Sequence, residues 1–441
     1  MSSVLSQTVP GQQVFGPELP DYDALQACIR CGRCLPVCPT YQDTTLETQS
    51  PRGRLSLLRA VENGKLDLSG GVGVHLYHCL DCRACNVVCP SGVRIGELIL
   101  QGRAAYAEQA GRPWWAKIAL DRFLTSARSL EPVMKLARLY QRTGLQMIVR
   151  PLLSRLARRF PRLLPLAYME ELLPQLSEPL HTQLSEVIPA KGEQRHRVGF
   201  FLGCMMSQVL PEVSRATVEV LTHNGCEVVV PPHQVCCGAP HEDQGNKRLA
   251  RDLARRNVDV FARYQDLDVI VSDCAACAGM IKEYGHLLHE DLAYAEKAAA
   301  MSARMRDVTE WLAEIIDGET LAGALARRAT YHAPCHQANV QGIVQQPIRV
   351  LQQVPGLDFV PLPDATRCCG SAGIYNLTHP EMADRLLEDK LNNVASTGAD
   401  LLVSSNPGCL LQLQMGVRER GMKVEVRHLT EVLAEVYRGS E

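Results

Sequence analysis

Cysteine is the residue type whose number and spacing most directly suggest chemistry in this chain. The 441 residues include 18 cysteines, most of them in short groups. Residues 28–39 read CIRCGRCLPVCP and residues 79–90 read CLDCRACNVVCP, so the run C-x2-C-x2-C-x3-C-P occurs twice. Thiols in a reducing compartment rarely form structural disulfides. Grouped cysteines of this kind therefore indicate metal or cluster ligands.

This run is typical of two-cluster ferredoxins, in which three thiolates bind one 4Fe-4S cluster and the fourth reaches the other cluster. Zinc ribbons are the alternative, but zinc commonly takes two C-x2-C pairs rather than four evenly spaced cysteines followed by proline. The spacing thus favours iron–sulfur clusters. We expect one cluster on Cys28, Cys31, Cys34 and Cys89 and the other on Cys79, Cys82, Cys85 and Cys38.

The C-terminal half contains one pattern written twice, marked by adjacent cysteines followed by glycine at residues 236–238 and 368–370. In each copy an apolar run ends in a cysteine, and a helix, a second apolar run, the cysteine pair, a long helix and a third apolar run follow. The last cysteine of the pair and the late cysteine of the copy, Cys237 and Cys277 or Cys369 and Cys409, are 40 positions apart in both copies. Alternating strands and helices predict βαβ units, whose ligand sites lie where parallel strands end.

Each copy should therefore gather its thiols at one edge of a sheet. The expected metal ligands are Cys204, Cys236, Cys237, Cys274 and Cys277 in the first copy, and Cys335, Cys368, Cys369 and Cys409 in the second. Asn406 stands where the first copy has Cys274.

The kind of metal at these two sites stays open between iron–sulfur and zinc. Adjacent thiols strain one tetrahedron but can bind different irons of a cluster, which favours iron–sulfur. The asymmetry could mean a cluster at one site and a structural metal at the other, or one lapsed site. His332 and His336 flank Cys335 and could ligate a metal or move protons, or simply pack beside a strand end. No residue is assigned as catalytic.

These patterns predict an α+β multidomain chain in four segments. We expect an all-helical two-cluster ferredoxin domain over residues 1–110, a helical connector over 111–190, and a duplicated α/β domain over 191–325 and 326–441.

The connector is basic and amphipathic. Residues 112–162 hold twelve Lys or Arg against two acids, together with tryptophans and leucine-rich stripes. Such helices can lie on an anionic bilayer, although the same pattern occurs on helices that pack against a core or a partner subunit. The formal net charge of −2 argues against a nucleic-acid partner. With no signal peptide or membrane-spanning run in view, we expect a cytoplasmic protein, free or peripheral on the inner face of the membrane.

The duplicated cysteine pattern resembles the CCG domain family, which includes heterodisulfide reductase subunits. Joined to a two-cluster ferredoxin module, the chain is similar to iron–sulfur subunits of glycolate oxidase. It is also similar, less closely, to the small subunit of anaerobic glycerol-3-phosphate dehydrogenase and to lactate-utilisation proteins. The stretches that favour glycolate oxidase are PRGR at 51–54, CCGSAGIYNLTHP at 368–380 and NPGC at 406–409.

The resemblance implies an iron–sulfur subunit of an oxidoreductase complex in which separate FAD-binding flavoprotein subunits oxidise glycolate. This chain would accept the electrons and pass them to a membrane quinone. No GxGxxG motif opening a βα unit is visible, so we expect no flavin in this chain. The alternatives are a heterodisulfide-type reductase acting through the CCG sites, or a relay for lactate or glycerol-3-phosphate.

Overall fold

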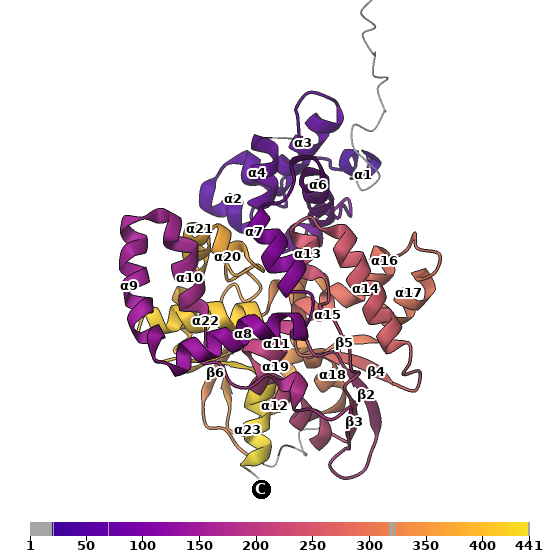
Figure 1. Cartoon of the computed structure of the whole chain (residues 1–441), viewed down its shortest axis with the longest axis vertical. Helices are drawn as coiled ribbons and strands as arrows, with labels where there is room; N and C mark the ends of the chain where they lie inside the picture. Colours follow the sequence, from indigo (N-terminus) through magenta and orange to yellow (C-terminus); the bar gives the residue numbers. More distant parts are fainter. Residues whose placement is uncertain (1–19, 21, 69, 317–320, 322, 440–441) are drawn as a thin grey trace, which may run out of the picture. The chain divides into compact units, whose positions relative to one another are not determined.

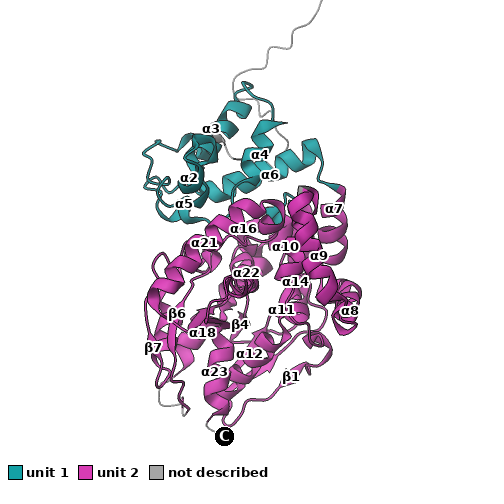
Figure 2. Cartoon of the chain, turned by 90° about the vertical axis from the view of Figure 1, so that its left-hand side faces the viewer, with its two compact units in different colours: residues 1–113, 242–247 teal, residues 114–241, 248–441 magenta. Residues whose placement is uncertain are grey.

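The computed structural model describes residues 20, 22–68, 70–316, 321 and 323–439 (Figure 1). The chain divides into two compact units, which Figure 2 distinguishes by colour. Unit 1 comprises residues 1–113 and 242–247, and unit 2 comprises residues 114–241 and 248–441. The expected mixture of helix and sheet in a multidomain chain is confirmed. Most of the predicted connector belongs to unit 2.

Unit 1 is built from short helices, and its described residues contain no strand. The helices of its N-terminal segment are α1 (Tyr22–Gln26), α2 (Pro39–Thr44), η1 (Glu47–Gln49), α3 (Pro51–Glu62), α4 (Gly71–Tyr77), α5 (Ala84–Val87) and α6 (Ile95–Ala110). Apolar side chains of α3, α4 and α6 form its core, with Leu55, Leu58, Leu76 and Ile99 almost fully buried.

The PRGR stretch begins α3. Pro51 occupies the first turn, where its missing N–H costs nothing, and the Ser50 hydroxyl caps the helix by accepting a 3.0 Å hydrogen bond from the Gly53 N–H. A Cβ at Gly53 would lie 1.8 Å from the Glu47 carbonyl oxygen, so only glycine fits. Arg54 points into the interior and is 1% exposed. The motif therefore sets a tight entry to the helix and delivers one buried cation.

Most of the connector forms helices, but β1 (Val187–Ile188), which lies within the predicted span 111–190, is a strand of the first sheet. The helices are α7 (Trp114–Ala116), the π-helix η2 (Lys117–Phe123), α8 (Ala127–Arg142), α9 (Leu145–Arg159), η3 (Pro161–Leu163), α10 (Leu164–Leu172) and η4 (Leu180–Thr182). Ser126 and Ser129 form a capping box at the start of α8. Within the described ranges, no helix combines the length and apolar character needed to cross a bilayer.

The remainder of unit 2 holds two sheets with matching topology. The first has the order β1-β3-β2-β4-β5, and all pairs are parallel except β1 with β3. The second has the order β7-β6-β8-β9 and is wholly parallel. Their strands are β1 (Val187–Ile188), β2 (His196–Phe200), β3 (Cys226–Val229), β4 (Val269–Ser272), β5 (Met305–Asp307), β6 (Arg328–Tyr331), β7 (Asp358–Phe359), β8 (Leu401–Ser404) and β9 (Glu425–His428).

Helices follow the strands in the order expected for βαβ units. Those of the first copy are α11 (Cys204–Val209), α12 (Pro211–His223), α13 (Ala239–Asp243), α14 (Lys247–Phe261), α15 (Ala275–Lys282), α16 (Tyr284–Leu287), α17 (Ala295–Arg304) and α18 (Val308–Ile315). Those of the second are η6 (His336–Val340), α19 (Gln345–Gln352), α20 (Tyr375–Thr378), α21 (Pro380–Thr397), α22 (Pro407–Glu419) and α23 (Leu429–Arg438).

The two copies share one hydrophobic core. It takes in Val198 and Val271 of the first sheet and Tyr331 and Val403 of the second, all buried. The first long helix of each copy packs on the last helix of the other, α12 on α23 and α19 on α18, and the α12–α23 pair can be followed in Figure 1. This reciprocal packing fixes the two copies against each other within unit 2.

Candidate functional site

The thiols of the two ferredoxin motifs line two separate hollows of unit 1. Cys28, Cys31, Cys34 and Cys89 line one hollow, together with Arg52 and Ile95. The fourth thiol comes from the second motif, as the predicted exchange of the last cysteine requires. Cys31 is exposed, whereas Cys34 is buried against the core.

The other hollow takes the complementary set, lined by Cys38, Cys79, Cys82 and Cys85 with Arg54 and Arg83 among its neighbours. Four thiols around each hollow are the donor set of a 4Fe-4S cluster. Burial raises the pKa of Cys79, and burial together with the neighbouring thiols raises that of Cys85 well above its usual value. These thiols would ionise only with compensating positive charge, which bound metal supplies. The residues present therefore fit the clusters, although ligation residue by residue remains a prediction.

Arg54 anchors the Cys38 side of this hollow. Its Nη2 donates to Thr40 Oγ1 at 3.1 Å and to Gln49 Oε1 at 2.9 Å, and its Nε donates to the His75 carbonyl at 2.8 Å. The Cys38 Sγ lies 3.3 Å from Thr40 Oγ1 and 3.7 Å from the Gln49 carbonyl. One buried guanidinium thus fixes the groups that contact the exchanged cysteine.

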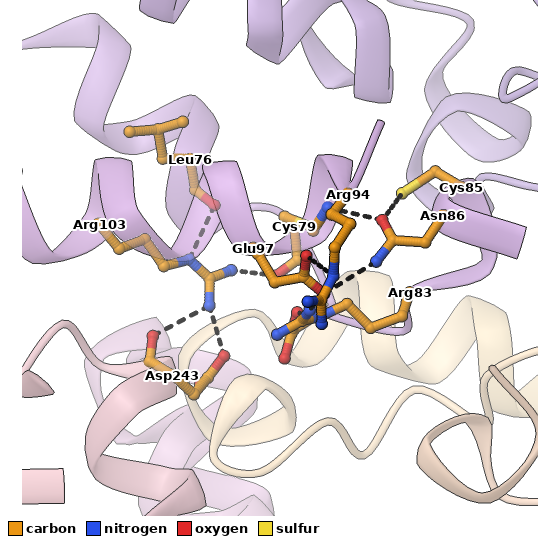
Figure 3. A network of polar contacts seen from close by, with 11 residues as sticks. Leu76, Cys79, Arg83, Cys85, Asn86, Arg94, Glu97, Arg103 and Asp243 are labelled. Atoms are coloured by element: carbon orange, nitrogen blue, oxygen red, sulfur yellow. Dashed lines mark hydrogen bonds and ion pairs between the residues drawn. The ribbon is translucent and has the colours of Figure 1, made fainter. Parts of the chain in front are cut away.

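Arg103 makes a comparable set of contacts on the Cys79 side (Figure 3). Its guanidinium donates to the carbonyls of Cys79 and Leu76, the latter at 3.1 Å, and forms an ion pair with Asp243. Asp243 comes from the six-residue segment that unit 1 takes from the first CCG copy. Arg103 is 1% exposed, so burial without these partners would be costly. Sequence reasoning singled out neither Arg103 nor this segment.

The first CCG copy brings all five of its expected thiols together. Cys204 begins α11 just after β2, the vicinal pair lies in the loop before α13, and Cys274 caps α15, its Sγ 3.4 Å from the backbone nitrogen of Cys277. All five are buried. Thiol–thiol hydrogen bonds and burial raise the pKa values of Cys204 and Cys277 well above normal, while the bond from Cys236 lowers that of Cys237.

The second copy is organised in the same way but with different donors. Cys369 and Cys409 are buried, and Cys368 accepts a 3.4 Å contact from the Gly370 N–H. The hydrogen bond with Cys368 lowers the pKa of Cys369, but the bond with Cys409 and burial outweigh it and raise that pKa well above its usual value. Cys335 precedes η6 and is half-buried. Among the described residues, the closest group of potential ligand atoms consists of His332, Cys369 and Cys409.

Asn406 joins the two CCG sites. Its Nδ2 donates to Cys409 Sγ at 3.6 Å, while its Oδ1 accepts from the Ala276 N–H at 3.2 Å and lies 3.8 Å from Cys274 Sγ. Asn406 occupies in the second copy the position that Cys274 occupies in the first. Its side chain also contacts Cys274 itself. Both sites lie at the carboxyl ends of their sheets, as the βαβ pattern predicts.

The third position of each CCG triplet requires glycine for its backbone conformation and for the space around it. Gly238 and Gly370 have φ values of +98° and +92°, in the region that favours glycine. A Cβ at Gly370 would lie 2.5 Å from the Ala383 carbonyl oxygen of α21, and one at Gly238 would lie 3.3 Å from Ala250 of α14. The glycine lets the long helix of each copy approach the cysteine pair.

One further cysteine and three histidines considered in the sequence contact groups other than the CCG thiols. Cys226 is fully buried in the shared core, as expected of a structural cysteine. His233 contacts Arg128, His241 contacts the Leu124 carbonyl, and His379 stacks on Tyr375.

Lys390 is a residue that sequence reasoning missed. It occupies a buried position of α21, where its Nζ donates to the carbonyls of Asp364 and Ala365. Burial lowers its pKa to about 8, and the nearby thiols of Cys369 and Cys368 oppose that shift. The sequence does contain a sign of this residue, because Lys390 falls among the regularly spaced apolar positions of α21.

Comparisons with known proteins agree with this geometry. A family described as "4Fe-4S dicluster domain" matches residues 24–93, and one described as "Cysteine-rich domain", the CCG family, matches 198–282 and 329–414. The chain is 36% identical over 424 residues to the probable glycolate oxidase iron-sulfur subunit of Bacillus subtilis (strain 168), covering 94% of each chain. It is 32% identical over 413 residues to the glycolate oxidase iron-sulfur subunit of Escherichia coli (strain K12), covering 93% of each.

A shorter relative is lactate utilization protein A of Geobacillus kaustophilus (strain HTA426). It is 33% identical over 237 residues, which are 54% of this chain and 98% of that protein. The paired four-thiol hollows, the duplicated CCG units and the similarity over nearly the whole chain lead to one conclusion. This chain belongs to the family of glycolate oxidase iron–sulfur subunits.

Proposed function

We propose that this chain is the electron-transfer subunit of a flavin-dependent complex that oxidises glycolate or a related 2-hydroxyacid. It would take electrons from FAD-binding flavoprotein subunits and pass them to a quinone. The observation that carries the proposal is the pair of four-thiol hollows, each completed by a cysteine of the other motif. Clusters held there would supply reversible one-electron carriage.

The chain's own residues would set how readily those sites take up an electron. Arg54 and Arg103 place buried positive charge beside the residues that contact or contain Cys38 and Cys79. Positive charge and N–H donors near a cluster ligand favour the reduced state and raise the reduction potential. The exposed Cys31 marks the side of the first hollow that a redox partner can approach.

The substrate of the flavoprotein partner is glycolate in this proposal, because both long relatives carry that name. Lactate is the second candidate, supported by the similarity to lactate utilization protein A. Steady-state oxidation by the purified complex separates them: the larger kcat/KM identifies the substrate. Reduction of a disulfide by the isolated chain would instead support a heterodisulfide-type reductase.

The relay itself is tested by removing one ligand. Cys31→Ser should abolish quinone reduction by the intact complex while leaving flavin reduction by substrate unchanged. Cys226→Ala is the matched control, since it removes a thiol that belongs to no site, and it should retain both activities. Quinone reduction that survives Cys31→Ser would contradict the relay.

We further propose that α8 and α9 make peripheral contact with the membrane that contains the quinone. Apolar side chains stand exposed on both helices, including Leu136 at 68%, Met147 at 80% and Ile148 at 66%. Arg155 and Arg158 lie near the end of α9. Exposed apolar side chains interleaved with basic ones suit an anionic bilayer surface.

Sedimentation with vesicles tests this contact. Binding should require anionic lipid, weaken with salt, and fall on Ile148→Asp but not on Leu292→Asp. Leu292 is fully exposed but lies outside these helices, which makes it the matched control. Absence of binding to anionic vesicles at low salt, or equal binding by both variants, would remove the proposal.

A further inference from the structure

His332 is a buried histidine whose ring nitrogens form no hydrogen bond. Its exposed fraction is 0%, and neither Nδ1 nor Nε2 has a partner within hydrogen-bond geometry; the nearby Ala365 carbonyl accepts from the Ala333 N–H at 3.2 Å. One of its ring nitrogens, the Cys369 Sγ and the Cys409 Sγ all lie within 4.8 Å of one another. A buried polar atom without a hydrogen-bond partner destabilises the folded state, so such a histidine calls for a partner.

A second buried histidine in the same sheet shows the usual arrangement. His428 at the end of β9 is also 0% exposed, but its Nδ1 accepts from the Thr430 N–H at 3.1 Å and its Nε2 donates to the Asp273 carbonyl at 3.0 Å. The ring nitrogens of His428 thus have hydrogen-bond partners, whereas the ring of His332 lies beside two thiols.

The two CCG copies differ at this very position. The backbone N–H of His332 bonds the Val403 carbonyl at 2.9 Å, and the N–H of Phe201 bonds the Val271 carbonyl at 2.8 Å. Phe201 and His332 are therefore equivalent residues, each three positions before the lone cysteine of its copy. The second copy has lost a thiol, Asn406 for Cys274, and gained an imidazole, His332 for Phe201.

This exchange changes the chemistry of the donor set. Five thiols and no nitrogen suit a site with several irons, whereas an imidazole with thiolates suits a single tetrahedral zinc ion. Ligand atoms around such an ion stand about 3.5–3.8 Å apart, a spacing that His332, Cys369 and Cys409 can reach with small movements.

The surrounding charge agrees with one divalent ion. A zinc ion with three thiolates and one neutral imidazole carries a net charge of about −1. The ammonium of Lys390 is buried beside Cys368 and Cys369 and can neutralise it. The equivalent position of the first copy, on α14, holds the neutral Asn257, which bonds the Cys236 carbonyl at 3.1 Å. The second copy therefore has both the lysine and the histidine, Lys390 and His332, where the first copy has neither.

We propose that the second CCG copy holds a single tetrahedral divalent metal ion of the zinc class, bound by His332, Cys369 and Cys409. The fourth ligand is one of the two remaining thiols: Cys335, or Cys368 at the cost of the strain that two adjacent thiols place on one tetrahedron. This proposal does not depend on the relay, because a chain that carried no electrons could still hold the ion.

Metal analysis and X-ray absorption at the zinc edge test the proposal on the full-length chain. We expect about one zinc per chain with one imidazole nitrogen and three sulfurs in its first shell. His332→Phe, which installs the residue of the first copy, should lose the zinc and keep the iron of the ferredoxin sites. His428→Asn, at the other buried histidine, should keep both.

Two results would overturn the inference. One is a wild-type chain whose zinc content is near zero, or whose zinc spectrum contains no imidazole. The other is an unchanged zinc content in folded His332→Phe. If that variant does not fold, the imidazole signal of the wild-type chain still decides. Loss of quinone reduction alone would bear on the relay and not on this site.

Discussion

Replacement of Gly370 by alanine should destabilise unit 2 more than the same change at Gly238. Both glycines have positive φ, so both variants should lose about 1–2 kcal/mol from backbone strain. Only at position 370 does the new Cβ meet backbone within 3.0 Å, at the Ala383 carbonyl oxygen and Cα. Because α21 would have to move, overpacking should add about 1–3 kcal/mol. We therefore expect a total loss of about 2–5 kcal/mol for Gly370→Ala.

Urea unfolding of the two variants and the wild type, followed by circular dichroism, measures these differences. Both glycines lie in unit 2, so the comparison concerns the same compact unit. The measurement should be made on the metal-loaded chain and again after chelation. We expect Gly370→Ala to be the less stable variant by about 1 kcal/mol or more in both states, since the clash is with the protein's own helix.

Two results would refute this reasoning. Equal destabilisation by the two variants would mean that the approach of α21 does not select the glycine. A difference that vanishes on chelation would mean that the glycine makes room for bound metal instead of for the helix.

Three further perturbations follow from the structure. Arg54→Gln should leave the buried acceptors beside Cys38 without their donor and so lower the iron content and the melting temperature of unit 1, whereas Lys65→Gln, at an exposed position outside both hollows, should change neither. Cys226→Val should cost less than about 1.5 kcal/mol in urea unfolding and leave iron and zinc contents unchanged, because the swap conserves volume in a core position. Burial lowers the pKa of His428 from 6.5 to about 4, so the stability it contributes is full above pH 6.5 and is lost as the pH falls towards 4. At pH 5 that loss is about 2 kcal/mol, and His428→Asn should remove this part of the pH dependence in urea unfolding.

The chain's sequence was most informative where cysteine spacing and strand periodicity coincide. The two copies of the CCG unit align from the sequence alone, because Cys237 to Cys277 and Cys369 to Cys409 span the same number of residues. Parallel strands then require their ends to meet at one edge, which brings the thiols of the first copy together.

What escaped prediction depends on contacts between distant residues. Nothing local marks Arg103 as the partner of Asp243, since the two are 140 positions apart. The contact of Asn406 with Cys274 likewise depends on how the two copies pack. The sequence leaves the role of His332 open, because it does not show whether the nitrogens of a buried ring have partners.

The central claim is that the thiol-lined hollows of unit 1 carry the electrons of substrate oxidation. Electron paramagnetic resonance of the intact complex, frozen after reduction by glycolate in the absence of quinone, tests it most directly. We predict signals of two interacting reduced 4Fe-4S clusters, with Cys31→Ser removing one of them. Full reduction of the flavin with no iron–sulfur signal in that sample, from a complex that reduces quinone at the full rate in a parallel assay, would contradict the account.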